Sequence, residues 1–342
     1  MGGRAPYLLT GLLKQVSRSF YLTLRVLPAA IRQQIGLAYL LARTADTIAD
    51  TQLVPLDRRL EALLWFRGRI SGESAAPSDL SDLAGHQGSL AEWSLLERIE
   101  ETLELLSQLS ADDQRHIRDV LDTITSGQEL DLIRFADGSV DRVISLNTDA
   151  ELDDYTYRVA GSVGVFWTKV CRAHIFADAI LDDAFLLNAG VQFGKGLQLT
   201  NILRDLSRDL RQGRCYLPED RLWAIGLTPF DLLEPSNEPR LRPLYDSYLA
   251  LAQDHLDAGW RYTLALPRSC ARVRLACAWP ILIGMRTLEQ LAINNVLAPE
   301  LRVKVSRAEV RRIIVRSVLC YPWPLAWARL FNRVIPTTEA AS

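Results

Sequence analysis

The sequence predicts an all-α protein. Apolar residues recur at intervals of three and four along most of the 342 residues, and no convincing run alternates between apolar and polar residues as a strand would. Apolar residues make up 49% of the chain and charged residues 23%, which supplies enough material for a large core. Helices are expected over residues 29–50, 56–72, 89–107, 111–134, 151–175, 182–212, 240–266, 271–296 and 306–320.

The predicted helices are bounded by recognisable signals. Pro28 stands directly before the first helix, and Gly213 directly after the sixth, as expected where helices begin and end. Residues 72–89 are small and polar and include proline and glycine, so a surface loop is expected there, and residues 227–241 are expected to form a second loop. Because no shift in composition divides the chain, a single domain is predicted for residues 1–342.

Composition and charge exclude several classes of protein. A formal net charge of −2 provides no basic excess for binding nucleic acid. The five cysteines are scattered and form no CxxC pair, so free thiols in a reducing cytoplasm are expected rather than a zinc site. The N-terminus lacks the features of a signal peptide, and no stretch of about 18 residues is apolar and free of charge. A cytoplasmic protein with no obligate protein partner is therefore expected.

Residues 317–336 are unusually aromatic and apolar. Pro322, Pro324, Arg329 and Arg333 interrupt this stretch, so it does not read as a spanning helix. Two interpretations stay open: a final helix packed on the core, or a segment that contacts the surface of a bilayer.

A first row of polar side chains lies in the segment YLLARTADTIADT. Its members follow one another at steps of four, three and four residues, which places them on one face of a helix. They are Tyr39, Arg43, Asp46 and Asp50. The residues between them are apolar or small, so two aspartates lie one turn apart on a helix that is otherwise suited to burial.

A second row lies in the segment QLTNILRDLSRD, at steps of three, four and four residues. Its members are Gln198, Asn201, Asp205 and Asp209. Arg204 and Arg208 flank the aspartates, and Arg214 follows the glycine that ends the helix.

Both rows suggest a site for a divalent cation. Like charges one turn apart destabilise even an exposed helix by roughly 0.2–0.5 kcal/mol, and burial adds more. Carboxylate and amide oxygens suit magnesium, which takes its other ligands from water and from substrate phosphates. Two such rows facing one another across a helical cavity would hold magnesium on a diphosphate. The alternative is that the aspartates pair with Arg43, Arg204 and Arg208 on solvated helix faces.

At these residues the chain resembles the squalene/phytoene synthase family. The resemblance covers nearly the whole length and includes SRSF at residues 17–20, the two aspartate motifs, YTYRVAGSVG at residues 155–164, and GRCYLP at residues 213–218. It implies a class I isoprenoid-synthase helical bundle around a central apolar cavity. The implied activity is prenyl transfer from farnesyl diphosphate, with magnesium as cofactor and manganese as an alternative.

The resemblance also implies roles for individual residues. Asp46, Asp50, Asn201, Asp205 and Asp209 would bind magnesium, and the four aspartates would thereby be catalytic. Ser17, Arg18, Tyr39, Arg43, Gln198 and Arg214 would bind the substrate. Tyr155 would assist proton removal or stabilise the cation, although a buried core tyrosine is the alternative from the sequence alone.

The C-terminal third bears on the branch of the family. CAWPILIGMRTL at residues 277–288 and RVKVSRAEV at residues 302–310 resemble squalene synthases, and Lys304 matches a lysine implicated in NADPH binding. The next basic position holds Ser306, with Arg307 one residue later, which departs from the family pattern.

Squalene synthesis is therefore the favoured activity, with NADPH as a second cofactor. Phytoene or dehydrosqualene synthesis, and a relative that stops at presqualene diphosphate or forms hydroxysqualene, remain alternatives. A class I terpene cyclase would share the metal-binding rows but not the Val-Ala-Gly element. A helical binding protein without catalysis belongs to another class, and the intact aspartate rows argue against it.

Overall fold

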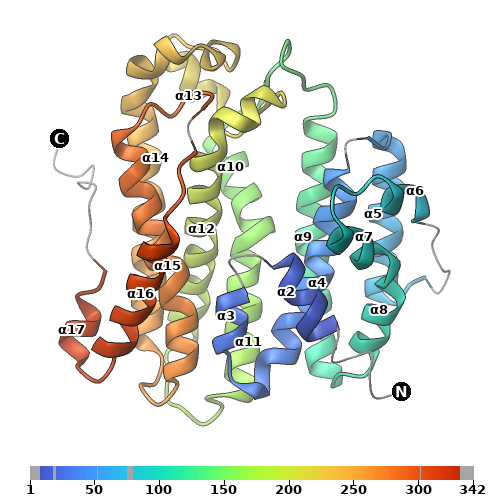
Figure 1. Cartoon of the computed structure of the whole chain (residues 1–342), viewed down its shortest axis with the longest axis vertical. Helices are drawn as coiled ribbons and strands as arrows, with labels where there is room; N and C mark the ends of the chain where they lie inside the picture. The colour runs from blue at the N-terminus through green and yellow to red at the C-terminus, as the bar shows by residue number, and fades with distance from the viewer. Residues whose placement is uncertain (1–7, 18–20, 52, 75–79, 301, 332–342) are drawn as a thin grey trace. The chain divides into compact units, whose positions relative to one another are not determined.

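A computed structural model describes residues 8–17, 21–51, 53–74, 80–300 and 302–331. Its helices confirm the prediction of an all-α fold, and in these residues the strand content is limited to two strands of two residues each (Figure 1). The chain divides into two compact units, each with its own set of packed helices. The single domain predicted from composition stays a prediction.

Unit 1 comprises residues 1–133 and 166–178. Its longest helices run beside shorter ones, and α4 contacts both α5 and α8 (Figure 1). Leucine, isoleucine and alanine side chains on α4 are fully buried, among them Ile31, Leu41 and Ile48. The elements are η1 (Leu8–Leu12), α2 (Leu13–Val16), α3 (Tyr21–Val26), α4 (Ala29–Asp50), α5 (Leu56–Ser71), α6 (Ser81–Gly85), α7 (Leu90–Glu97), α8 (Ile99–Ser107), α9 (Ala111–Arg134) and most of α11 (Ser162–His174).

Unit 2 comprises residues 134–165 and 179–342. In it α12 packs along α14, and α15 lies beside both α14 and α16 (Figure 1). One apolar core joins these helices and includes Leu203, Leu256 and Ile281. The elements are β1 (Ile144–Ser145), α10 (Asp149–Thr156), η3 (Tyr157–Gly161), the start of α11, α12 (Asp183–Arg211), β2 (Arg214–Cys215), α13 (Glu219–Ala224), η4 (Phe230–Leu233), η5 (Pro235–Asn237), α14 (Glu238–Ala265), α15 (Ala271–Ile293), α16 (Arg307–Cys320) and α17 (Pro324–Ala328).

The predicted helix boundaries agree closely with the structure. The helices expected over 29–50 and 111–134 are α4 and α9 without change, and Pro28 precedes α4 as expected. The helix expected over 89–107 is divided into α7 and α8 at Arg98. The expected loop over 72–89 contains the short helix α6, and the expected loop over 227–241 contains two 3₁₀ turns and the start of α14. Short helices such as these bury too few apolar residues to leave a periodic signal.

Close backbone approach explains the glycines of the Val-Ala-Gly segment. A Cβ atom on Gly164 would lie 1.9 Å from the carbonyl oxygen of Gly190, and one on Gly194 would lie 2.1 Å from that of Ala160. Ala160 lies in the π-helical turn η3, and such turns are frequent at functional sites. These contacts show that Gly164 and Gly194 allow tight packing of the backbone.

The C-terminal segment packs in part on the core of unit 2. The Trp327 side chain is only 2% exposed and stacks on Trp260 with 4.9 Å between ring centroids. Trp323 and Leu325 on the same segment remain 64% and 76% exposed. Residues 332–336, the end of the aromatic stretch, lie outside the described residues. No described helix has both the length and the apolar character needed to cross a membrane.

Candidate active site

The first aspartate row lies at the C-terminal end of α4, in unit 1. Asp46 is half-exposed, with 47% of its side-chain surface accessible, and Asp50 is exposed at the last helical position. Thr44, Thr47 and Thr51 each donate a hydrogen bond to the backbone one turn earlier, so their hydroxyls are satisfied locally. The threonines therefore do not compensate the charges of Arg43, Asp46 and Asp50, which need partners on other elements.

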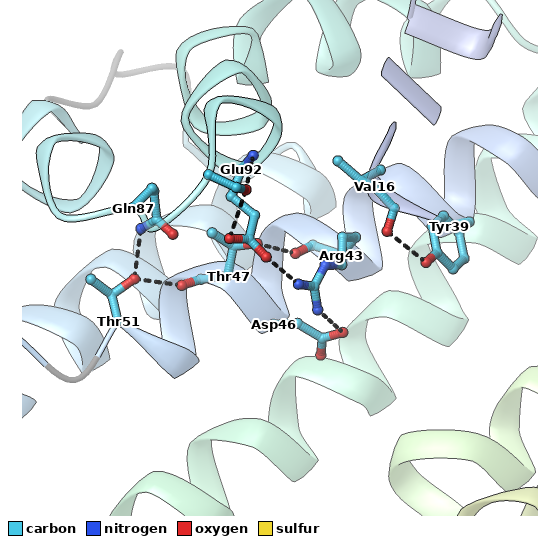
Figure 2. A network of polar contacts seen from close by, with 9 residues as sticks. Val16, Tyr39, Arg43, Asp46, Thr47, Thr51, Gln87 and Glu92 are labelled. Carbon is cyan, nitrogen blue, oxygen red and sulfur yellow. Dashed lines mark hydrogen bonds and ion pairs between the residues drawn. The ribbon is translucent and has the colours of Figure 1, made fainter. Parts of the chain in front are cut away.

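Arg43 forms the centre of a polar network around this row (Figure 2). Its guanidinium donates to Oε1 of Glu92 at 2.5 Å and lies 3.8 Å from Oδ2 of Asp46. Glu92 is held in turn by Ser89, whose hydroxyl donates to it and also accepts from its backbone N–H. This is a helix-capping arrangement at the start of α7, so local capping also orients the carboxylate that holds Arg43.

The carboxyl of Asp46 is poorly compensated. Although Asp46 is half-exposed, partial desolvation by the surrounding helices, with the Asp50 carboxylate one turn away, raises its pKa from 3.8 to about 6, and Arg43 and a hydrogen bond from Gln128 oppose this. The Gln128 amide on α9 donates to Oδ1 of Asp46. A carboxyl with a raised pKa is stabilised by binding either a proton or a cation.

A cavity of about 290 Å³ opens beside the row. Arg43, Asp50 and Glu92 line it together with Thr47, Thr51, Leu53, His86, Gln87 and Gly88. Gln87 donates to Thr51, which ties the loop before α7 to the end of α4 (Figure 2). The lining is mainly polar, so this cavity suits a charged group better than a prenyl chain.

The N-terminal candidates lie close to the first row. The Tyr39 hydroxyl donates to the backbone oxygen of Val16 at 3.4 Å, which brings α4 next to Ser17 at the end of α2 (Figure 2). The Ser17 hydroxyl is buried and has no hydrogen-bond partner among the described residues. Arg18, also expected to bind substrate, lies outside the described residues.

The second aspartate row lies on α12, in unit 2, and arginines of the same helix compensate it. Arg204 donates to both oxygens of Asp205, at 3.0 and 2.7 Å. Arg208 lies 3.3 Å from both Asp205 and Asp209. Asn201 is exposed one turn before Asp205, and Gln198 is half-buried one turn earlier. The ion pairs that the sequence offered as an alternative to metal binding are thus present in the second row.

Asp209 has a raised pKa, as Asp46 does, although arginines lie close to it. Burial is the main cause that raises its pKa from 3.8 to about 6; Asp205 adds to the increase, and Arg208 and Arg214 oppose it. Arg214 is placed by β2, which pairs in parallel with β1 so that Ile144 is aligned with Arg214. The turn before β2 requires glycine, because Gly213 has φ +79° and a Cβ there would lie 2.1 Å from the backbone N of Ser139.

Tyr155 belongs to an aromatic cluster of unit 2. Its ring stacks on Tyr216 with centroids 4.9 Å apart, and the two hydroxyls are 3.4 Å apart. Phe135 contacts the ring of Tyr216 edge-on, with 5.2 Å between the two ring centroids. Tyr155 is 8% exposed, so its hydroxyl lies in a largely apolar setting beside a second phenol.

Of the two candidates for NADPH binding, Lys304 lies three residues before α16 and Arg307 is its first residue. Lys304 and Arg307 are exposed and make no ion pair with another described residue. Ser306, which departs from the family pattern, caps the helix: its hydroxyl accepts from Glu309 N–H, and the Glu309 side chain accepts from Ser306 N–H. The departure therefore has a structural role at the helix start.

The donor atoms of both rows fit magnesium. Among the described residues no three His, Cys, Asp or Glu side chains form a complete metal-binding cluster. Magnesium does not need one, because it commonly takes one or two carboxylates and fills its octahedron with water and substrate phosphate. Each row has two aspartates one turn apart, and the second row adds Asn201, so both rows meet that requirement. Whether the two rows meet around one diphosphate stays a prediction, since they belong to different units.

The sequence did not reveal three residues of these sites. Gln128, Glu92 and Tyr216 reach the predicted residues from other elements. Glu92 carried a detectable signal, since Ser89 three residues earlier gives the Ser-x-x-Glu spacing that is typical of a helix start. Tyr216 lies within the GRCYLP motif, where nothing distinguishes it as a site residue, and Gln128 has no local signal.

Comparisons with known proteins identify the family of the chain. Residues 13–309 match the family described as squalene/phytoene synthase. The chain is 27% identical over 306 residues to the presqualene diphosphate synthase of Rhodopseudomonas palustris, covering 88% of this chain and 93% of that protein. It is 26% identical over 312 residues to the squalene synthase of Schizosaccharomyces pombe, covering 90% of this chain but only 64% of that protein. The solved structure of TcSQS in complex with E5700 superposes with a TM-score of 0.75 at 23% identity, covering 97% of this chain and 93% of that one.

Proposed function

Because the chain belongs to the squalene/phytoene synthase family, we propose that it is a magnesium-dependent prenyltransferase that condenses two farnesyl diphosphates head to head to presqualene diphosphate. The observation that carries the proposal is the pair of carboxylates one turn apart in each row. In each pair one aspartate, Asp46 or Asp209, has its pKa raised to about 6. A divalent cation removes the free-energy cost of keeping such a pair ionised.

The residues would act in three groups. Asp46 and Asp50 would hold magnesium on one diphosphate, and the members of the second row would hold it from α12. Bound magnesium would supply Lewis-acid stabilisation of the departing diphosphate oxygens. The substrate diphosphates would contact Arg43, Arg214, Arg18, Ser17, Tyr39 and Gln198. An apolar chamber for the prenyl chains is part of the proposal, because an allylic cation must be kept from water.

Tyr155 and Tyr216 would act on the reacting hydrocarbon. Two stacked phenol rings present π-electron faces that stabilise a nearby cation. The Tyr155 hydroxyl, 3.4 Å from that of Tyr216, has a neighbour through which a proton can pass.

The final product depends on a second step. We propose that Lys304 and Arg307 bind NADPH and that presqualene diphosphate is reduced to squalene. The exposed cations at the start of α16 support this, since both suit a nucleotide phosphate. Release of presqualene diphosphate is the first alternative, supported by the relative from Rhodopseudomonas palustris, which this chain matches over nearly the full length of both. Hydroxysqualene formation from that intermediate is a related alternative, and phytoene or dehydrosqualene synthesis is another.

One set of incubations distinguishes these activities. Purified protein is mixed with farnesyl diphosphate and magnesium, or manganese in its place, with and without NADPH. Squalene formed only with NADPH is the expected result. Presqualene diphosphate or hydroxysqualene in both conditions would contradict the reduction step alone. Dehydrosqualene, or activity only on geranylgeranyl diphosphate, would favour the carotenoid branch. No reaction with either substrate would contradict the proposed activity.

We also propose that the C-terminal segment contacts a membrane surface peripherally. Leu319 is 63% exposed, and Trp323 and Leu325 are similarly accessible. Arg312 and Arg316 are exposed on α16, before Leu319. Apolar and aromatic side chains flanked by arginine are typical of interfacial segments. Trp323→Ser should reduce flotation with vesicles that contain anionic phosphatidylglycerol, whereas Leu90→Ser, at a site 84% exposed in unit 1, should not. Equal flotation of both variants would remove the proposal. Point variants are needed because truncation would also remove the buried Trp327.

A further inference from the structure

Gln128 contacts the first aspartate row from a different helix. Its side chain is 8% exposed, and its Nε2 donates to Oδ1 of Asp46 across 82 residues of chain. Its other amide atom, Oε1, is buried and accepts no hydrogen bond from another described residue. Buried polar atoms are almost always hydrogen-bonded, so this oxygen requires a donor.

The contact with Asp46 fixes which way the amide is oriented. An ionised carboxylate accepts hydrogen bonds and cannot donate, so the nitrogen of Gln128 must be the atom that faces it. The oxygen is consequently directed away from Asp46 while remaining beside the aspartate row. Water is the fitting donor, and magnesium retains several waters when it binds carboxylates.

We propose that Gln128 is a positioning residue of the first magnesium site. Its Nε2 holds the Asp46 carboxylate in place, and its Oε1 accepts a hydrogen bond from a water molecule carried by the metal. The inference rests on the proposed function, in which Asp46 and Asp50 hold magnesium. Groups that orient metal ligands and their waters typically alter metal affinity by about 10–100-fold when removed.

Gln34 provides a matched control in the same unit. It is also 8% exposed, its Nε2 also donates to an aspartate, Asp113 at 3.1 Å, and its Oε1 is also buried without a described partner. Asp113 differs from Asp46 because His174 contacts its other oxygen at 2.7 Å and no second carboxylate lies one turn away on α9. The two glutamines therefore share burial and hydrogen bonding but differ in proximity to the aspartate row.

The experiment compares Gln128→Leu, Gln128→Met and Gln34→Leu in the full chain. Calorimetric titration with magnesium, and spin-resonance titration with manganese, are carried out in the presence of inorganic diphosphate and without turnover. Both Gln128 variants should bind the metal about 10–100-fold more weakly than the wild type, and Gln34→Leu should bind it normally. In turnover assays, excess magnesium should restore most of the rate to the Gln128 variants, because the ligands themselves are intact. The methionine variant retains an unbranched side chain in case leucine disturbs packing, and thermal unfolding verifies the fold of each.

The contrary outcomes are separable. Metal affinity within twofold of wild type in a folded Gln128 variant would overturn the inference and leave the proposed function standing. An equal loss in Gln34→Leu would also overturn it, since general loosening of unit 1 would then be the cause. Failure of the wild-type protein to bind magnesium with diphosphate would contradict the proposed function itself.

Discussion

The two aspartate rows have the same spacing but are compensated differently. On α12, arginines adjacent in sequence contact the aspartates, and Arg204 grips Asp205 with two hydrogen bonds. On α4, the nearest arginine is held at 2.5 Å by Glu92 and stays 3.8 Å from Asp46, whose hydrogen bond comes from Gln128 instead. The same pattern of aspartates can therefore be stabilised locally or by distant parts of the chain. Among the described residues, Asp46 has one arginine within 4 Å, whereas Asp205 has two.

Neutralising one aspartate in each row should have the largest effect. Asp46→Asn and Asp205→Asn should each lower turnover by about 10³-fold, because a metal ligand contributes several kcal/mol to stabilising the transition state. Circular dichroism should show an unchanged helical content. Equal losses of turnover would indicate that both rows serve the reaction, although the charges of their aspartates are compensated by different residues. Normal turnover in either variant would mean that its row does not bind the catalytic metal.

Asp209→Asn should change the stability of the protein in a way that depends on pH. A carboxyl whose pKa is raised from 3.8 to about 6 on folding binds more protons in the native state, so its contribution to stability is lost as pH rises from about 4 to 6. The variant should therefore be more stable than wild type at pH 7 without metal, by about 3 kcal/mol at most, and equally stable at pH 4.

Urea denaturation at both pH values measures this difference. Asp46→Asn should show a smaller gain, because 47% of its side chain is accessible and solvent screens the charge. A larger gain for Asp46→Asn would show that the charge of Asp46 costs more folding stability than that of Asp209, contrary to this prediction. No gain at pH 7 for either would show that the carboxylates are compensated in another way.

Removing the charge of Glu92 tests the smallest effect. Glu92→Gln should release Arg43 from its closest ionic partner and lower kcat/KM by about tenfold, which corresponds to about 1.4 kcal/mol of lost positioning. The matched control is Ser89→Ala, which removes the helix cap and the hydrogen bond from Ser89 to Glu92 at a cost of about 1 kcal/mol in stability but keeps the carboxylate charge that pairs with Arg43. Steady-state kinetics of both variants, with thermal unfolding, distinguish the two roles. A similar loss of kcat/KM in Ser89→Ala would assign the effect to the cap.

Much of the fold was predictable because helix formation leaves a local signal. The limits of α4 and α9 followed from apolar periodicity, and the segment that became α10, η3 and α11 was predicted as one helix. The π-helical turn within it was not predictable, because no local pattern in the sequence marks it. Short helices such as α6 and α13 also escaped prediction, because a single turn has no period to detect.

The sequence by itself determined which carboxylates share a helix face, because a spacing of four residues has that consequence on any helix. Only the tertiary structure decided how each face is compensated. Glu92 reaches Arg43 across 49 residues and Gln128 reaches Asp46 across 82, and such pairings depend on how helices pack rather than on local sequence. Periodicity specifies the direction of a side chain relative to its own helix, whereas the identity of the neighbour depends on the whole folded chain.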